Sequence, residues 1–277
     1  MNDCGNISRP KPFKPLAEMN VNQSLENLFS LSGKVAFVTG GGTGIGRTMS
    51  QILAKVGASV VVTSRREELL IETVKNITAQ NGQCAHVTAD LSQTENISGF
   101  VEQATKPFGF PDILVNAAGV NFREPVEKIT PEIWEQTLAI NLRTPFFLAQ
   151  LLVPEMQRKS WGRIINLASL QSQRAFPNSM PYGASKGGVT QLTRAMAEAW
   201  SNQGICCNAI APGFFPTAMT EPIFNDPERA AHNAKQTAIG RNGELRDLEG
   251  ITVFLASPAS DYITGQTIYV DGGFTAK

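Results

Sequence analysis

The sequence predicts an α/β fold, namely a single doubly wound domain with a central seven-stranded parallel sheet and helices on both faces. From residue 31 onward, short runs rich in valine and isoleucine alternate with longer stretches of helical periodicity. This alternation is typical of right-handed β-α-β units. The 277 residues are 42% hydrophobic and 17% charged, a composition that supports one sizeable core. No internal repeat divides the chain.

The expected strands are apolar without strict alternation, as in parallel strands that are covered on both faces. They occupy residues 35–39, 59–63, 83–88, 113–116, 163–167, 205–210 and 267–270. The expected helices occupy residues 45–56, 66–79, 92–106, 131–158, 181–202 and 246–256. The irregular segment 213–241, rich in proline, phenylalanine and alanine, is too long for an ordinary connecting loop, so we interpret it as a lid on the substrate side.

Residues 1–30 differ from the rest of the chain and form an N-terminal extension. Prolines and lysines are interleaved between positions 10 and 15, and the extension lacks the apolar stretch of a secretory signal. Two interpretations remain open. The extension is either a poorly ordered tail or an arm that packs on its own domain or on a neighbouring subunit through Val21, Leu25, Leu28 and Phe29. The helical spacing of Leu25 and Leu28 favours the arm.

Charge and cysteine usage argue against several classes of protein. Lysine plus arginine and aspartate plus glutamate number 24 each, so no net charge favours binding to nucleic acid or to an anionic membrane. No apolar run approaches the roughly 20 residues of a membrane span. The four cysteines show no metal-ligand spacing and are expected to be reduced thiols of a cytoplasmic protein. His86 and His232 also lack metal-ligand neighbours, so we expect no metal.

A glycine-rich turn follows the first expected strand, with glycines at positions 40, 44 and 46. Glycines let the backbone approach a pyrophosphate closely, and the amide groups that open the next helix attract its negative charge. The spacing G-x-x-x-G-x-G differs from the common dinucleotide fingerprint G-x-G-x-x-G. The turn nevertheless predicts a site for a phosphate-bearing cofactor.

The second expected strand ends without the acidic residue that selects NAD through the ribose 2′-hydroxyl. Ser64 and Arg65 stand there instead, and a guanidinium beside a hydroxyl is suited to a 2′-phosphate. We therefore predict NADP(H) as the cofactor. The alternative is that Arg65 and Arg66 are solvated residues that open the next helix. Even then, the missing acid argues against strict dependence on NAD.

A tyrosine and a lysine four residues apart indicate the chemistry. Tyr182 and Lys186 lie on one face of an expected helix, where the ammonium group is expected to lower the pKa of the phenol. Reduction of a carbonyl needs an acid that protonates the developing alkoxide, and such a tyrosine can supply the proton. Ser169, at the end of the fifth expected strand, can donate a hydrogen bond to the substrate oxygen.

Together, the turn T-G-x-x-x-G-x-G at 39–46, Ser169 and the Y-x-x-x-K pair resemble the short-chain dehydrogenase/reductase family over about residues 31–273. The resemblance implies a Rossmann-fold domain over residues 31–277 and a catalytic tetrad of Asn141, Ser169, Tyr182 and Lys186, in which the asparagine helps to hold a water molecule next to the lysine. It implies a cofactor site made of Gly40, Thr43, Gly44, Ile45, Gly46, Ser64, Arg65, Asp90, Leu91, Asn116, Ala117, Gly119, Tyr182, Lys186, Pro212, Gly213 and Thr217. One departure is N-A-A-G at 116–119 in place of the family's N-N-A-G, and the alanine still permits close packing.

Two further motifs leave questions open. Phe214 and Phe215 stand where the family often has smaller residues, and they are either lid core or an aromatic wall of the pocket. The sequence Asp271-Gly272-Gly273 resembles the family's D-G-G, which closes the sheet and often contributes to subunit packing.

The resemblance implies an NADP(H)-dependent oxidoreductase that interconverts a secondary alcohol and a ketone on a small molecule. Segments 28–34 and 240–274 look most like sugar-acid and polyol dehydrogenases, gluconate 5-dehydrogenases among them, so a sugar acid, a polyol or a related hydroxy compound is the expected substrate. The alternative enzyme is a 3-oxoacyl-[acyl-carrier-protein] reductase. The alternative of another class is a non-catalytic cofactor-binding scaffold or sensor, against which the complete tetrad argues. The resemblance also implies a homotetramer, or at least a dimer, with contacts through helices 131–158 and 181–202 and residues 271–274.

Overall fold

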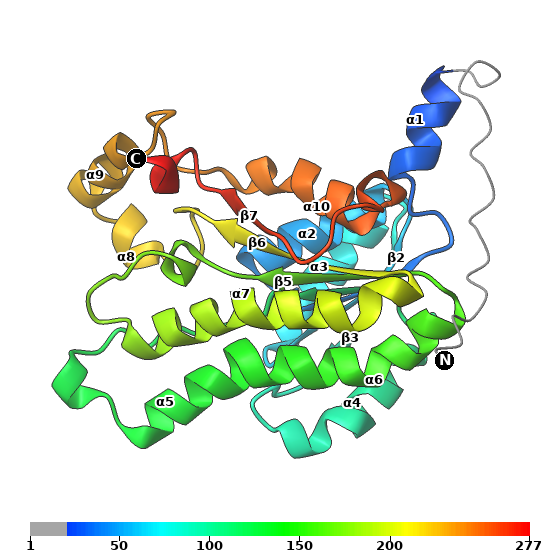
Figure 1. Ribbon diagram of the computed structural model, residues 1–277, viewed down its shortest axis with the longest axis horizontal. Helices are drawn as coiled ribbons and strands as arrows, with labels where there is room; N and C mark the ends of the chain where they lie inside the picture. The colour runs from blue at the N-terminus through cyan, green and yellow to red at the C-terminus, as the bar shows by residue number, and fades with distance from the viewer. Residues whose placement is uncertain (1–20) are drawn as a thin grey trace, which may run out of the picture.

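A computed structural model describes residues 21–277 and confirms the predicted fold class, with seven parallel strands in one sheet (Figure 1). The strands are β1 (Val35–Thr39), β2 (Ser59–Ser64), β3 (Gln83–Thr88), β4 (Ile113–Asn116), β5 (Gly162–Leu167), β6 (Ile205–Pro212) and β7 (Thr267–Val270). Their order across the sheet is β3-β2-β1-β4-β5-β6-β7. The strand order therefore reverses between β1 and β4, and ligands of such sheets bind outside the carboxyl ends of the strands at this point.

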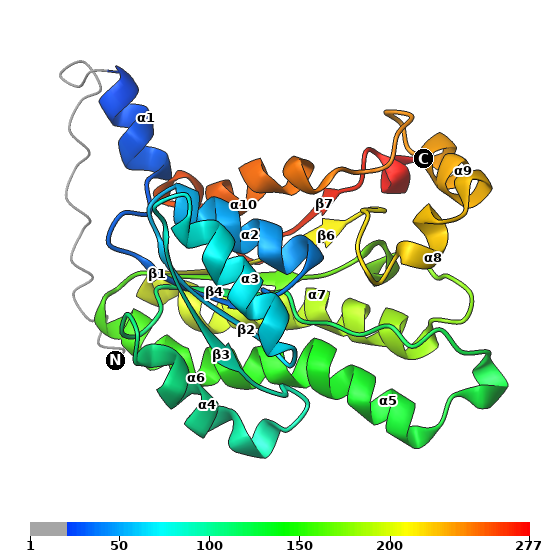
Figure 2. The same cartoon turned by 180° about the vertical axis from the view of Figure 1, so that it is seen from behind.

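Helices cover both faces of the sheet (Figures 1 and 2). One face carries α2 (Gly44–Lys55), α3 (Glu67–Thr78) and α10 (Glu249–Ala256). The other face carries α4 (Ile97–Thr105), α6 (Thr144–Arg158) and α7 (Met180–Trp200), with α5 (Pro131–Leu138) preceding α6. This is the doubly wound arrangement that the alternating pattern of the sequence predicts.

Neighbouring residues of each central strand pack into two different hydrophobic clusters. On β1, Val38 joins Leu53 of α2 in one cluster, whereas Phe37 joins Leu148 and Leu152 of α6 in the other. All five side chains are at most 1% exposed. Burial of each such side chain contributes about 1.5–3 kcal/mol. Because both faces of the strands are covered, the strands need no alternation of polar and apolar residues.

The segment 131–158 is helical over the expected bounds, but it is not α-helical throughout. A π-helical turn, Ala139–Arg143, separates α5 from α6, and the Thr144 N–H donates to the carbonyl of Ala139 five residues earlier. Pro145 follows directly and has no N–H group with which to bond the carbonyl of Asn141, four residues before it. The proline therefore interrupts the regular pattern, and π-turns of this kind often mark functional sites.

Another expected helix, over residues 92–106, begins only at Ile97. The residues before it form a turn in which the Asp90 carboxylate accepts hydrogen bonds from the backbone N–H and the hydroxyl of Ser92, at 3.0 and 2.8 Å. Short polar side chains that bond to nearby backbone in this way compete with helix formation.

The segment 213–241 contains two helices, α8 (Glu221–Phe224) and α9 (Pro227–Gln236), so its description as irregular is wrong. The Asp226 side chain caps α9 by accepting from the backbone N–H groups of Glu228 and Arg229, both at 3.1 Å. An acidic residue directly before a proline is a helix-start signal that the composition of the segment obscures.

The N-terminal extension falls partly outside the described residues, because the description begins at residue 21. Residues 21–29 form α1 (Val21–Phe29), which packs against a short 3₁₀ turn, Pro258–Ser260, before β7. Val21 and Leu25 of this helix are 71% and 51% exposed. The two interpretations of the extension, as far as they concern residues 1–20, lie outside the described part of the chain.

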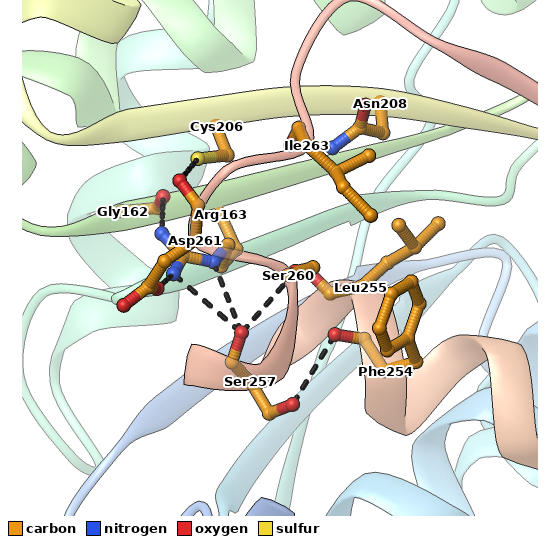
Figure 3. A network of polar contacts seen from close by, with 10 residues as sticks. All are labelled: Gly162, Arg163, Cys206, Asn208, Phe254, Leu255, Ser257, Ser260, Asp261 and Ile263. Atoms are coloured by element: carbon orange, nitrogen blue, oxygen red, sulfur yellow. Dashed lines mark hydrogen bonds and ion pairs between the residues drawn. The ribbon is translucent and has the colours of Figure 1, made fainter. Parts of the chain in front are cut away.

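Arg163 lies at the amino end of β5 and is 1% exposed. Its guanidinium donates to the carbonyl of Gly162 at 2.9 Å and to the carbonyl of Ser257, and forms an ion pair with Asp261 (Figure 3). The Arg163 side chain is 2% exposed, whereas the Asp261 side chain is 59% exposed. Loss of the Asp261 carboxylate would therefore leave a buried guanidinium without its charged partner. This network links the segment that leads into β7 to β5, at the amino-terminal end of the strands.

Candidate active site

A cavity of about 370 Å³ lies at the carboxyl ends of the strands. Its walls come from the turns that follow β1 to β6 and from the start of α7. All the predicted site residues except Asn116 and Asn141 line it: Gly40, Thr43, Gly44, Ile45, Gly46, Ser64, Arg65, Asp90, Leu91, Ala117, Gly119, Ser169, Tyr182, Lys186, Pro212, Gly213 and Thr217. The fold thus brings the predicted cofactor residues and the Ser169, Tyr182 and Lys186 side chains to one place.

The glycine-rich turn requires glycine at two positions. A Cβ atom on Gly46 would lie 2.3 Å from the carbonyl oxygen of Gly40, and Gly40 itself has a φ of +70°. The turn is also held from outside, because Arg47 bonds to Glu72 through both its terminal nitrogens, at 2.9 and 3.0 Å, and to the carbonyl of Gly42 at 2.9 Å. The amide groups at the start of α2 therefore face the cavity from a fixed loop.

Arg65 and Asp90 lie close enough to interact at the end of the cavity next to β2 and β3. The pKa of Asp90 is below its usual value. Loss of solvation acts to raise it, but hydrogen bonds from the backbone and hydroxyl of Ser92 and the charge of Arg65 outweigh this effect. Ser64 and Arg66 line the same end. This end of the cavity therefore has two guanidinium groups beside one carboxylate.

Ser169 is positioned by the turn that follows β5. It caps a 3₁₀ turn, Leu170–Ser172, in which its hydroxyl accepts from the N–H of Gln171 at 3.1 Å. The hydroxyl of Ser172 accepts from the N–H of Ser169 at 3.3 Å and donates to the carbonyl of Lys186 at 2.7 Å. Ser172 thereby joins the Ser169 turn to α7, which carries Tyr182 and Lys186.

Burial dominates the protonation of Tyr182 and Lys186. It raises the pKa of Tyr182 above its usual value of 10, while a hydrogen bond with Ser169 and the charge of Arg123 act to lower it. Burial also lowers the pKa of Lys186 to about 8. The Lys186 Nζ lies 5.6 Å from the centre of the Tyr182 ring and donates to the carbonyl of Leu167. The lowering of the tyrosine pKa by Lys186 stays a prediction.

Asn141 lies behind the cavity rather than in its wall. It belongs to the π-helical turn and is 1% exposed. Its amide exchanges two hydrogen bonds with the backbone of Val120, at 2.9 and 3.0 Å, and donates to the hydroxyl of Ser185 at 3.0 Å. Ser185 in turn donates to the carbonyl of Tyr182 at 2.7 Å. The Asn141 side chain therefore supports the start of α7 next to the tyrosine.

Asn116 lies beneath the floor of the cavity, on β4. Its side chain is 4% exposed and donates to Asn166 at 2.8 Å, and Asn166 donates to Thr193 of α7 at 2.9 Å. This buried chain links β4, β5 and α7. The Oδ1 atom of Asn116 is buried without a hydrogen-bond partner within residues 21–277.

Several cavity residues carry no sequence signal of their own. Arg123 and Asn121 follow β4, Gln171 follows Ser169, and Phe176 precedes α7. Arg123 is exposed, and its charge acts on Tyr182. A single arginine in a loop cannot be distinguished in the sequence from a solvated one. Only the fold shows that this guanidinium lines the same cavity as the tyrosine and that its charge acts on it.

Phe214 and Phe215, for which the sequence allows either a core or a cavity-wall role, differ in the structure. Phe215 is 2% exposed and belongs to a core cluster, with Gly243 packed so closely that a Cβ on it would lie 2.5 Å from the Phe215 ring. Phe214 is less buried and packs edge-on against Phe176, with the ring centres 6.0 Å apart. Phe215 is thus mainly core and Phe214 mainly cavity wall.

Two classes of feature are missing from residues 21–277. No group of three or more histidine, cysteine, aspartate or glutamate side chains in this range is arranged to hold a metal ion. None of its helices combines the length and the apolar character that crossing a membrane requires.

The low pKa of Lys186 predicts a pH effect on stability. Because the folded value of about 8 lies below the ordinary 10.5, the unfolded chain binds more protons between these limits, so the lysine's contribution to stability rises with pH through this window. Between pH 7.5 and 9.5 this gain is about 2 kcal/mol. Urea unfolding of Lys186→Met should lack the gain, whereas Lys75→Met, at an exposed position on α3, should keep it. A similar pH dependence in both variants would contradict the burial effect.

Comparison with known proteins agrees with this geometry. A family model described as enoyl-(acyl carrier protein) reductase matches residues 40–275. Gluconate 5-dehydrogenase of Gluconobacter oxydans is 37% identical over 251 residues, which cover 91% of this chain and 98% of the relative. The 2-dehydro-3-deoxy-D-gluconate 5-dehydrogenase of Bacillus subtilis is 40% identical over 253 residues, covering 91% and 99%.

A solved structure shows the same likeness. The gluconate 5-dehydrogenase of Burkholderia cenocepacia, in complex with NADP and tartrate, superposes with a TM-score of 0.86 at 35% identity, over 91% of this chain and 99% of that one. With a family match over most of the chain and relatives of this identity over nearly their whole length, the chain belongs to the short-chain dehydrogenase/reductase family of oxidoreductases.

Proposed function

We propose that the protein is an NADP(H)-dependent oxidoreductase that interconverts a secondary alcohol and a ketone on a sugar acid or a related hydroxy compound. The observation that carries this proposal is the position of Arg123, a guanidinium at the wall of the cavity whose charge acts on Tyr182. The Gluconobacter and Burkholderia relatives are named for gluconate, and the Burkholderia structure contains tartrate, so carboxylates recur among them.

The cavity suits NADP(H) at its adenosine end. The close approach of Gly46 to Gly40 leaves room for a pyrophosphate against bare backbone, and the start of α2 supplies amide donors. Ser64 and Arg65 would hold the 2′-phosphate, since no carboxylate follows β2 directly. Asp90 and Leu91 would border the adenine. Bound NADPH supplies a hydride at the carbonyl carbon.

The roles we propose for the side chains follow from their positions. Tyr182 protonates the carbonyl oxygen as negative charge develops on it, and Ser169 donates a hydrogen bond to the same oxygen. Lys186 would bind the nicotinamide ribose and favour the ionised tyrosine, and Asn141 would hold the start of α7 and a water molecule beside the lysine. Pro212, Gly213 and Thr217 would contact the carboxamide.

The substrate class can be tested with a panel of ketones and NADPH oxidation as the signal. The panel holds a ketohexonic acid, the neutral ketose of equal length and a 3-oxoacyl thioester. We expect the ketohexonate to be favoured over the ketose. Loss of a charge-assisted hydrogen bond costs about 1.5–3 kcal/mol, so Arg123→Leu should lower this preference by about 10–100-fold.

The preference is the ratio of kcat/KM for the ketohexonate to that for the ketose. A change in the protonation of Tyr182 that lowers the turnover of both substrates equally therefore leaves this ratio unchanged. Arg123→Lys keeps the charge and should retain much of the preference. Equal treatment of acid and ketose by the wild type would contradict the sugar-acid assignment. Faster turnover of the thioester would favour 3-oxoacyl-[acyl-carrier-protein] reduction, the alternative enzyme, and no turnover with any ketone would favour the cofactor-binding scaffold.

We also propose a cytoplasmic homotetramer. Phe147 and Leu151, four residues apart on α6, are each 37% exposed and form an apolar strip on the outer surface. Met180 at the start of α7 is 57% exposed. By contrast, Asp271 and Phe274 are buried within the protomer, which favours the helices as contact surfaces. Sedimentation equilibrium at micromolar concentration should show four chains, and a monomer would contradict the proposal.

Two assignments of the chain's segments remain proposals. Residues 213–241 act as the lid, because Thr217, Met219 and Thr220 of this segment line the cavity. Residues 21–29 act as an arm, because α1 packs on its own domain while Val21 and Leu25 stay exposed.

A further inference from the structure

The Asp271-Gly272-Gly273 turn, which the cofactor site does not use, fastens the C-terminus to the end of the lid. The Asp271 carboxylate shapes the turn by accepting from the N–H of Gly273 at 2.9 Å and from the N–H and hydroxyl of Thr275 at 2.9 and 2.7 Å. The carbonyl of Gly272 accepts from the N–H groups of Ala238 and Ile239, at 2.7 and 3.1 Å. The C-terminus accordingly lies beside α9 (Figure 1).

Two more contacts make this junction tight. Lys277 Nζ donates to the carbonyl of Thr237 at 2.8 Å. A Cβ on Gly273 would lie 2.7 Å from the Cβ of Ala238. The last seven residues and the segment 237–239 therefore behave as one packed unit.

This turn places Phe274 behind the aromatic wall of the substrate end. Phe274 is 4% exposed and does not line the cavity, whereas Phe176 and Phe214 do. The ring centre of Phe274 lies 5.7 Å from that of Phe214 and 6.2 Å from that of Phe176. These separations and tilted geometries are typical of favourable aromatic pairs. Each ring comes from a segment that follows a different strand, β5, β6 or β7.

We propose that Phe274 is a positioning residue that sets substrate selectivity by holding Phe176 and Phe214 as a rigid wall, and that the C-terminal turn fastens this wall to the lid. The inference rests on the proposed ketone reduction. With the Phe274 ring removed, the two wall rings lose a packing partner on the side away from the cavity and can relax into the space left behind. The substrate end then becomes wider, fits a compact polar ketone less well and admits a bulkier apolar one.

The test compares Phe274→Ala and Phe274→Leu with the wild type on a ketohexonate and on an alkyl 3-oxo ester. In Phe274→Ala the ratio of kcat/KM for the ester to that for the ketohexonate should rise at least about tenfold, since mismatches in pocket size are worth about 10–200-fold. Most of the change should come from a higher KM for the ketohexonate. The ratio for Phe274→Leu should lie between those of the wild type and Phe274→Ala. NADPH affinity, measured by fluorescence, should stay the same.

Phe100→Ala is the matched control. Phe100 is 8% exposed and packs on Phe37 with ring centres 5.4 Å apart, in the cluster beneath α4 and α6. This variant loses a buried aromatic ring far from the wall, so its ester-to-ketohexonate ratio should equal that of the wild type. A ratio that Phe274→Ala leaves unchanged, or a shift of equal size in Phe100→Ala, would overturn the inference.

Tryptic cleavage at Arg229 and Lys235, both exposed on α9, tests without any substrate whether Phe274 helps to hold the lid in place. Cleavage should be faster in Phe274→Ala than in the wild type and in Phe100→Ala. If the wild type reduces none of the ketones, the proposed function fails. Faster cleavage of the lid in Phe274→Ala alone would still support the inference that Phe274 holds the aromatic wall and the lid together. Equal cleavage rates in all three proteins would overturn that inference.

Discussion

Tyr182→Phe should abolish turnover while NADPH binding stays nearly intact. The phenylalanine keeps the ring in its place on α7 but cannot donate a proton to the developing alkoxide. Loss of a positioned general acid typically costs about 10²–10⁴-fold in rate. NADPH oxidation with the best ketone of the panel measures the rate, and NADPH fluorescence measures the binding.

Tyr262→Phe is a suitable control, because Tyr262 is fully exposed at a loop before β7 and lies outside the cavity lining. This variant should have wild-type activity. If Tyr182→Phe keeps activity within a few fold of Tyr262→Phe, the assignment of Tyr182 as the proton donor is wrong. A loss of NADPH affinity in parallel with activity would point instead to a role in cofactor binding.

Replacing Ser64 by aspartate and Arg65 by isoleucine should shift the cofactor preference from NADP(H) toward NAD(H). Removal of the guanidinium deletes a charge-assisted contact to the 2′-phosphate, worth about 1.5–3 kcal/mol. The new carboxylate repels that phosphate and accepts hydrogen bonds from the ribose hydroxyls. The efficiency with NADPH should therefore fall at least about tenfold, since about 1.4 kcal/mol is sufficient for that change.

The ratio of kcat/KM for the two cofactors is the measurement. Arg65→Ile and Arg66→Ile, made singly, show which guanidinium holds the phosphate, because both residues line this end of the cavity. We expect the ratio to fall with Arg65→Ile and to change little with Arg66→Ile. An unchanged ratio in the double variant would mean that Arg65 faces solvent, and the preference for NADP(H) would have to be abandoned.

The sequence alone determined the fold class and the seven strands, and it identified most of the residues that line the cavity. These features depend on local signals, namely apolar runs, helical spacing and glycines where the backbone must approach a ligand. The glycine at 46 is an example, because no side chain fits between it and the carbonyl of Gly40. Signals of this kind survive in a single sequence because each lies within a few neighbouring residues.

Only the tertiary structure decided the remaining features. It showed that Arg123 lines the same cavity as Tyr182 and that Asn116 and Asn141 support the cavity from behind. It also showed that the Asp271 turn brings Phe274 against Phe214 and Phe176, which lie 60 and 98 positions earlier in the chain. It further showed that Phe214 belongs mainly to the cavity wall and Phe215 mainly to the core. Each of these facts depends on the distance between segments far apart in the sequence, and such distances are set by how strands and helices pack rather than by local residue patterns.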